Sequence, residues 1–492
     1  MFSILEQIVA LDKLSMALFV FLFLISALFI YPTMALLLHQ TPSLSLSSSV
    51  SALADTKRLE IPPATQQIHL CVLIHGWLGS PSEMLAIQRS LDAQIRQAKG
   101  LPIHRENSFP RTNERTDADD VSSIVSSEEE EESSAPVSAH NIPDDTSILM
   151  HSVTCNENKT TDGVLAGGSR VAKEVNDLIK ELLVDSEAYI RKDVEISISF
   201  IGNSLGGLYA RAALAELEWE LPNGKKLIPN VFCTTATPHL GKRGQTYVRL
   251  PRFAETGIGL ALQPTGQDLF GLNQVIEDLA TDIKYIEPLK QFRKRIAYAN
   301  AFGTDLQVPT ATAAFLADTE SPHYTQESKP PFLLTVTTPR DETILKSVTE
   351  AKSALASSTE DSSSSLSSDQ STKITKGHIP ASTIARTLDA CGWTKVFCDV
   401  RDKLFSVPVP FRSDENSSEF KVKESWSSHD LKSSLASQNI VDKRWSIPFG
   451  HTMLIANSKS ELYAKLNSGG KPFVEALTSD FLEDILDCDT TS

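Results

Sequence analysis

The stretch that most constrains the fold of this 492-residue chain covers residues 194–211. An apolar, β-rich run leads directly into Gly-Asn-Ser-Leu-Gly at 202–206, and a helical pattern begins at once after it. Glycines on both sides of a serine allow the sharp strand-to-helix turn that raises the hydroxyl above the end of a parallel sheet. We therefore expect Gly202 and Gly206 to form a nucleophile elbow, with Ser204 as the candidate nucleophile.

The rest of the chain alternates between strand and helix patterns. Strands are expected at 68–74, 147–153, 194–201, 230–235, 295–300, 332–336 and 395–400. Helices are expected from about residue 82 and at 163–183, 204–217 and 473–486. Such alternation is typical of βαβ units with right-handed crossovers. The sequence therefore predicts an α/β protein with a mostly parallel sheet and helices on both faces.

Composition excludes several classes of function. The net charge of −16 argues against nucleic-acid binding, which needs a basic face. The six cysteines form no C-x-x-C pair, which argues against a zinc site. We expect no metal and no organic cofactor.

The N-terminus suggests a membrane anchor within residues 1–39, followed by a linker at 40–64. Residues 14–38 carry no charge, and about 20 apolar residues suffice to span a bilayer. A single-pass protein of the endoplasmic reticulum or another endomembrane is expected, with its orientation open. The alternative is a cleaved signal peptide and a secreted protein.

A single large domain is expected at 65–488, with three disordered inserts. The first, near 104–145, holds five consecutive glutamates, and those near 348–377 and 413–440 are rich in serine. Apolar stretches at 244–290 interrupt the strand-helix rhythm on the side of Ser204. They indicate a cap or lid, or else a fixed helical excursion.

A serine hydroxyl needs a general base, and the base needs a carboxylate to orient it. In chains with this elbow the order is serine, then acid, then histidine. Asp305, just after the strand at 295–300, is the expected acid, and Asp341 is the alternative. His451, late in the chain and before the last helix, is the expected base.

The oxyanion that forms during attack on a carbonyl needs backbone donors. One is expected from the residue after the nucleophile and one from the loop after an earlier strand. His-Gly-Trp at 75–77 follows the strand at 68–74. We therefore expect the N–H groups of Trp77 and Leu205 to form the oxyanion hole.

Several segments, taken together and in order, resemble a eukaryotic family of serine esterases in the lipase-like α/β-hydrolase superfamily, long carried as a domain of unknown function. The matching segments are 75–81, 154–164, 172–175, 200–211, 235–241, 265–270, 298–313, 392–396 and 449–457. The resemblance implies an α/β-hydrolase fold, hydrolysis of a lipid ester, and the same roles for Ser204, Asp305 and His451. The family often has histidine where this chain has Asn203.

These observations predict a membrane-associated serine hydrolase that cleaves lipid esters through an acyl-enzyme. The expected partners are a lipid ester substrate and the bilayer, with no nucleic acid. The alternatives are an acyltransferase or thioesterase using the same three residues, and a catalytically silent hydrolase fold acting as a membrane scaffold.

Overall fold

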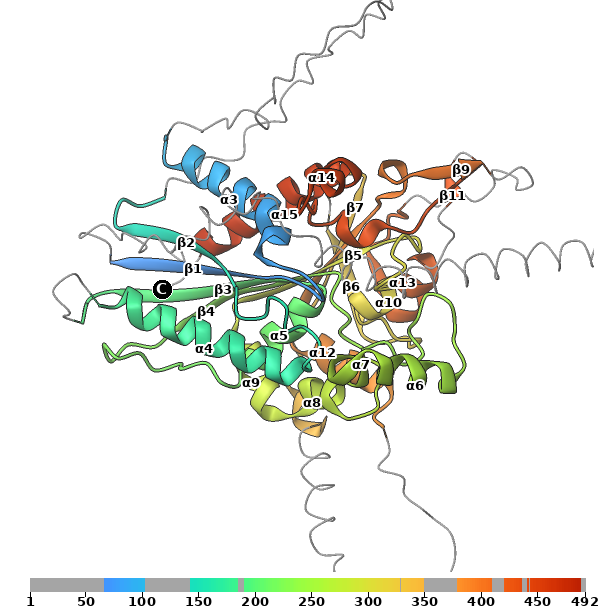
Figure 1. Ribbon diagram of the computed structural model, residues 1–492, viewed down its shortest axis with the longest axis horizontal. Helices are drawn as coiled ribbons and strands as arrows, with labels where there is room; N and C mark the ends of the chain where they lie inside the picture. Colours follow the sequence, from blue (N-terminus) through green and yellow to red (C-terminus); the bar gives the residue numbers. More distant parts are fainter. Residues whose placement is uncertain are drawn as a thin grey trace, which may run out of the picture. The chain divides into compact units, whose positions relative to one another are not determined.

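A nine-stranded sheet crosses the described part of the chain in the order β10-β6-β7-β8-β5-β4-β3-β1-β2 (Figure 1). Six neighbouring strands are parallel. They are β1 (Gln67–Ile74), β2 (Thr146–Ser152), β3 (Glu195–Asn203), β4 (Ile228–Thr235), β5 (Lys294–Asn300) and β8 (Trp393–Cys398). The computed structural model describes residues 66–101, 142–184, 190–327, 329–348, 378–408, 420–435, 440–441 and 443–487.

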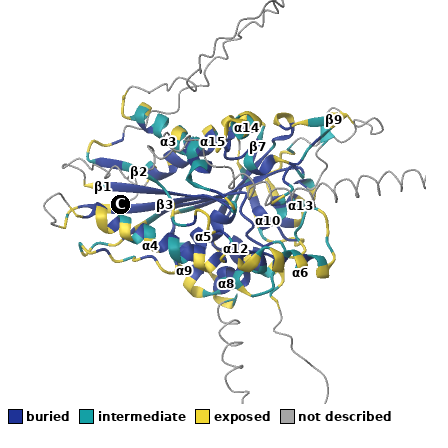
Figure 2. Cartoon of the chain, in the orientation of Figure 1, coloured by how far each residue is buried: buried dark blue, intermediate teal, exposed yellow. Residues whose placement is uncertain are grey.

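Helices cover both faces of this sheet (Figure 1). One face carries α3 (Leu85–Ala98), which follows the short helix η1 (Pro81–Met84), and α15 (Lys471–Leu486). The other carries α4 (Val164–Leu182), α5 (Leu205–Ala213), α9 (Ile283–Gln291) and α12 (Ala381–Ala390). Because neither face meets solvent, β1 and β3 are buried over almost their whole length (Figure 2). This arrangement confirms the predicted α/β-hydrolase fold.

Three antiparallel strands extend the sheet beyond β8. They are β7 (Leu333–Thr338), β6 (His323–Glu327) and β10 (Ser425–Ser427). A separate small sheet joins β9 (Ser406–Pro408), β12 (Arg444–Ser446) and β11 (Ile440–Val441). The strand patterns alone did not reveal the direction of β7, because a short run buried on both faces looks the same in either orientation.

The segment between β4 and β5 holds α6 (Arg252–Ala261), α7 (Gln263–Leu269) and α8 (Val275–Thr281) before α9. Helix α9 packs against α5 and leads straight into β5. It therefore acts as the crossover helix of a βαβ unit, and the part that can serve as a cap ends at α8.

Several expectations fall on residues outside the described ranges. These are the anchor and linker at 1–64 and most of the inserts near 104–145 and 348–377. Among the described residues, no helix has the length and apolar character needed to cross a bilayer.

The expectation of disorder at 413–440 is wrong for residues 425–435. That stretch forms β10 and α13 (Ser428–Leu435). Trp426, Leu431 and Leu435 are buried in a cluster with side chains of β6, β7 and β8. These three apolar side chains pack the segment against the sheet although many serines surround them. A prediction from average composition does not detect so few apolar contacts.

An ion pair is buried between the sheet and α12. The Lys395 ammonium group lies 2.6 Å from Asp389 Oδ1 and donates to the Tyr324 hydroxyl at 3.0 Å. That hydroxyl donates to Asp389 Oδ2 at 2.9 Å. Burial raises the pKa of Asp389 to about 6 and lowers the pKa of Lys395 to about 8. The opposite charge of each partner favours the ionised form of the other and so offsets part of the cost of burial.

Replacing Lys395 by methionine is expected to lower the free energy of unfolding by about 3–5 kcal/mol, because Asp389 then stays buried without its cation. Urea unfolding followed by tryptophan fluorescence measures the change. The matched control is Lys173→Met, which removes an exposed pair with Asp177 and should change the midpoint little. Equal midpoints for both variants would contradict this assignment.

Candidate active site

Ser204 lies at the turn between β3 and α5 with φ 53° and ψ −122°. A non-glycine residue with positive φ stores strain and persists only where its surroundings hold it. Here the Ser204 N–H donates to the Thr235 carbonyl of β4 at 2.7 Å. The side chain remains partly exposed. The sharp strand-to-helix turn expected from the sequence is therefore present.

The glycines of this turn lie where a side chain would collide with backbone. A Cβ on Gly206 would come within 3 Å of the carbonyl oxygens of Ile74 and His75. A Cβ on Gly202 would meet the backbone of Gly207 equally closely. The start of α5 can therefore sit directly on the end of β1, which brings Ser204 next to the loop that follows that strand.

Replacing Gly206 by alanine is expected to destabilise the protein by about 1–3 kcal/mol or more, because backbone atoms of β1 cannot move aside as a flexible side chain could. Thermal unfolding measures the loss. The control is Gly257→Ala in α6, where a Cβ meets nothing within 4 Å and should add about 0.5–1 kcal/mol of helix stability. A melting temperature for the Gly206 variant equal to wild type would contradict the close packing.

Two loops meet to bring His451 beside Asp305. Backbone bonds join the loop after β5 to the segment before the short helix η4 (Gly450–Thr452). Leu306 N–H donates to the Pro448 carbonyl at 3.0 Å, and Gly450 N–H donates to the Thr304 carbonyl at 2.8 Å. Asp305 and His451 are thus held on paired stretches of backbone, although they are far apart in sequence.

The side chains of Ser204, His451 and Asp305 form a continuous hydrogen-bonded chain. His451 Nδ1 lies 2.9 Å from Asp305 Oδ2, and His451 Nε2 lies 3.0 Å from Ser204 Oγ. An ionised carboxylate only accepts, so Nδ1 must carry the proton. In a neutral imidazole Nε2 is then the acceptor, and the serine hydroxyl donates to it. This is the protonation state in which the histidine can take the serine proton.

Asp305 is oriented by three further donors. Its Oδ1 accepts from the N–H groups of Gln307 and Val308, both at 2.8 Å. Its Oδ2 accepts from Asn300 Nδ2 at 3.1 Å in addition to His451. Asn300 is not among the residues expected from the sequence, although a polar residue that ends the apolar strand just before Asp305 was a usable signal.

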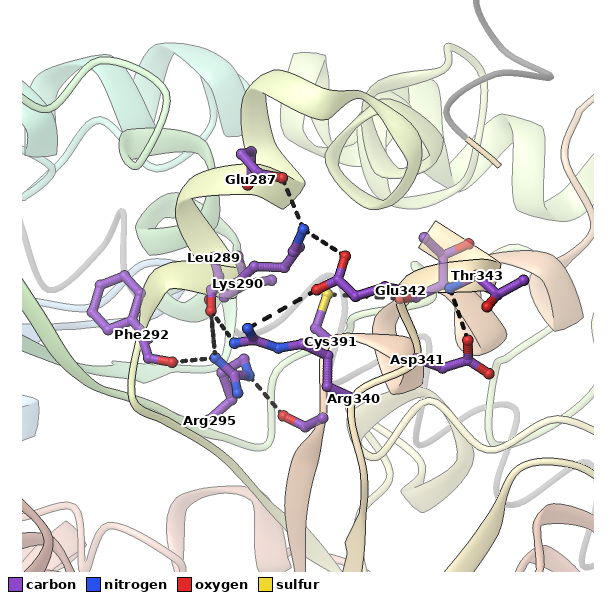
Figure 3. Close-up of polar contacts among 12 residues, drawn as sticks. Glu287, Leu289, Lys290, Phe292, Arg295, Arg340, Asp341, Glu342, Thr343 and Cys391 are labelled. Atoms are coloured by element: carbon purple, nitrogen blue, oxygen red, sulfur yellow. Dashed lines mark hydrogen bonds and ion pairs between the residues drawn. The ribbon is translucent and has the colours of Figure 1, made fainter. Parts of the chain in front are cut away.

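Asp341, the alternative acid, lies at the opposite edge of the sheet. The antiparallel β7 ends beside the beginning of β8, where Thr338 pairs with Trp393, and Asp341 N–H bonds to the Ala390 carbonyl. Its carboxylate accepts from Thr343 N–H (Figure 3). Ser204 and His451 lie at the carboxyl end of the parallel strands, so the Asp341 carboxylate cannot reach His451.

The loop after β1 lies directly against Ser204. A Cβ on Gly76 would lie 2.9 Å from Ser204 Cβ. Trp77 is the next residue, and Leu205 begins α5, where the first N–H groups have no partner within the helix. Among the described residues no hydrogen bond is found for either N–H. Of the two expected oxyanion donors, Leu205 therefore follows Ser204 in the chain, and Trp77 lies in the loop that packs against it.

The other histidines near the site are buried and engaged in the fold. His239 contacts Thr234 Oγ1 at 3.0 Å and Arg211 at 3.3 Å. Burial lowers its pKa well below the usual value. His75 Nδ1 contacts the Gly76 carbonyl at 3.1 Å. In the described ranges no group of three potential ligand side chains could hold a metal ion.

A cavity of about 390 Å³ lies beside the cap helices, away from these groups. Its lining includes Leu240, Arg252, Asp268, Ile276, His378 and Ile384. The side chains of Ser204, Asp305 and His451 do not line it.

The sheet order, the strained serine after a parallel strand and the later aspartate and histidine define the class of α/β-hydrolases. A family model described as "Putative serine esterase (DUF676)" matches residues 64–319. The match covers just over half of the 492 residues, and the chain belongs to this family. The matched part includes Ser204 and Asp305, whereas His451 lies beyond it.

Two similar proteins add context. "Putative lipase ROG1" from Saccharomyces cerevisiae (strain ATCC 204508 / S288c) is 34% identical over 165 residues, which cover 32% of this chain and 22% of the yeast protein. The aligned part is thus about a fifth of that relative. The structure of "Phospholipase PlaB from Legionella pneumophila" has 14% sequence identity and a TM-score of 0.24, covering 50% of this chain and 42% of that one.

Proposed function

We propose that this protein is a serine hydrolase that cleaves carboxylic esters of lipids through an acyl-enzyme. The observation that carries the proposal is the unbroken contact from Ser204 Oγ through His451 to Asp305, at 3.0 and 2.9 Å. In such an arrangement the histidine increases the nucleophilicity of the serine, and the carboxylate orients and stabilises the imidazolium that forms.

The reaction then has two halves. Ser204 Oγ attacks the ester carbonyl while its proton passes to His451 Nε2, and the N–H groups of Trp77 and Leu205 stabilise the oxyanion. The tetrahedral intermediate collapses, the C–O bond to the alcohol breaks, and His451 returns the proton to the leaving oxygen. His451 then deprotonates a water molecule, which attacks the carbonyl carbon of the acyl-enzyme. The bond from this carbon to Ser204 Oγ breaks, and His451 Nε2 returns the proton to Oγ as the acid leaves.

Exposed apolar side chains on α6 and beside His451 support a lipid as substrate. Phe253 and Leu260 of α6 are 80% and 58% exposed, and Phe449, two residues before His451, is 48% exposed. The segment between β4 and the cap also contacts the loop after β5, where Lys242 Nζ donates to the Gln307 carbonyl at 2.6 Å. An anchor at 14–38 would hold such a surface close to a bilayer.

The double variant Phe253→Ser/Leu260→Ser is expected to lose activity on lipid vesicles by about tenfold, because two exposed apolar groups no longer contact the lipid. Hydrolysis of a soluble butyrate ester by the same protein should stay near wild type. Fatty-acid release and p-nitrophenol release measure the two activities. Equal activity of variant and wild type on vesicles would contradict a lipid contact through α6.

The proposed function is tested by incubating the purified protein with esters of increasing acyl length and measuring the products. Release of the free acid in water supports hydrolysis, and incorporation of ¹⁸O from labelled water identifies water as the acceptor. Transfer to an added alcohol in preference to water would favour an acyltransferase, and faster turnover of a thioester than of its oxygen ester would favour a thioesterase. No turnover of any ester would favour a silent scaffold.

A further inference from the structure

We propose that Glu83 and Thr160 are positioning residues that hold the oxyanion loop in place and leave the Trp77 N–H as its free donor. The oxyanion loop is defined here as the turn Gly76-Trp77-Leu78-Gly79 after β1. This inference rests on the proposed function and names residues that support the same site. Neither residue contacts the reacting atoms; each acts through the backbone of the turn.

Thr160 holds the far side of the turn. It comes from the loop between β2 and α4, is 1% exposed, and its Oγ1 accepts from the Leu78 N–H at 2.9 Å. Leu78 has φ 52°, and its side chain is 46% exposed. A strained residue with little packing of its own needs an outside contact to remain in place, and the Thr160 hydroxyl supplies it.

Glu83 holds the near side of the turn. Its side chain comes from η1, is buried, and its Oε2 accepts from the Gly76 N–H at 3.3 Å. A Cβ on Gly79 would collide with the same carboxylate. Lys459 Nζ lies 3.9 Å from Glu83 Oε1, so the loop that follows His451 contributes to the charge balance of this carboxylate.

The turn contains four backbone N–H groups. Gly76 N–H goes to Glu83 and Leu78 N–H goes to Thr160. Gly79 N–H closes the turn on the Gly76 carbonyl at 3.2 Å. For Trp77 N–H no acceptor is found among the described residues. Because its neighbours on both sides are fixed, this N–H is held beside Ser204 without rearrangement, which is what a preorganised oxyanion donor requires.

Thr160 also connects the turn to the cap and to the nucleophile helix. Its carbonyl accepts from Thr265 Oγ1 of α7 at 2.8 Å and from the Tyr209 hydroxyl of α5 at 3.2 Å. A single residue therefore touches the oxyanion loop, the cap and the helix that starts at the nucleophile. The position of the donor is tied to all three.

The test compares Thr160→Val, which removes the hydroxyl at nearly constant shape, with Thr160→Ser, which keeps it. Glu83→Leu and Glu83→Gln form the second pair. Thr387→Val is the control, because it removes a buried hydroxyl that bonds within α12, away from the site. Each full-length protein is assayed on a soluble butyrate ester, with active sites counted by complete fluorophosphonate labelling. The Ki of a trifluoromethyl ketone, whose adduct with Ser204 carries an oxyanion, is measured in parallel.

For Thr160→Val and Glu83→Leu we expect kcat per labelled site to fall roughly 10- to 100-fold, with KM changed less than about threefold and Ki raised in proportion to the loss in kcat. Thr160→Ser and Glu83→Gln should recover most of the loss, and Thr387→Val should match wild type.

Two results would overturn the inference in different ways. An active wild type beside Thr160→Val and Glu83→Leu variants with normal kcat per site and normal Ki would remove the positioning roles and leave the proposed function intact. A wild type that neither labels nor turns over any ester would remove the proposed function, and the inference with it.

Discussion

Alanine at position 204 is expected to lower kcat for ester hydrolysis by about 10⁶-fold, because no other group takes over covalent catalysis once the nucleophile is gone. The fold should persist, since the Ser204 side chain is partly exposed and its backbone N–H to Thr235 remains. Hydrolysis of a soluble butyrate ester by wild type and variant at equal concentration measures the effect.

The matched control for this prediction is Ser468→Ala. Ser468 is exposed, and its hydroxyl donates only to the nearby Lys465 carbonyl at 3.0 Å among the described contacts. This variant should hydrolyse the ester at the wild-type rate. A Ser204 variant that keeps more than about a hundredth of wild-type activity would show that another group performs the reaction.

Replacing Asp305 by asparagine is expected to lower kcat by about 10⁴-fold. The amide nitrogen would be a donor where His451 Nδ1–H needs an acceptor. An amide turned to present its oxygen to His451 would instead direct its NH₂ at the N–H groups of Gln307 and Val308. The first orientation favours the imidazole tautomer that cannot accept the serine proton, and the second loses the two backbone bonds that orient the side chain at position 305.

Asp341→Asn provides the control, because its carboxylate accepts from Thr343 N–H at the opposite edge of the sheet (Figure 3). Its kcat should equal that of wild type. The reverse outcome, a large loss for Asp341→Asn and a normal rate for Asp305→Asn, would contradict the arrangement of the site. Circular dichroism of both variants separates a loss of fold from a loss of chemistry.

Much of the site was predictable because its signals are local. The elbow places two glycines around Ser204 between an apolar strand and a helix. Chain order then selects an aspartate just after a strand and a histidine before the last helix. The parallel strands β1 to β5 were visible as apolar runs because both faces of the sheet are covered. Their boundaries differ from the expected ones by a few residues.

What could not be predicted depends on contacts between distant segments. The bond between Thr160 and Leu78 joins residues 82 positions apart, and no pattern in either neighbourhood points to the other. Residues 425–435 dock through three apolar side chains in a serine-rich stretch, so composition pointed to disorder. Asp341 follows a strand as Asp305 does, and only the antiparallel direction of β7 separates the two.

The mass of the intact protein after treatment with a fluorophosphonate tests most directly whether Ser204 is an activated nucleophile. Such a reagent phosphonylates a serine only when a base and an oxyanion site activate it. We expect one adduct per wild-type chain, located on Ser204 by peptide sequencing and absent from Ser204→Ala. An unlabelled wild type, or an adduct that persists in Ser204→Ala, would contradict this role of Ser204.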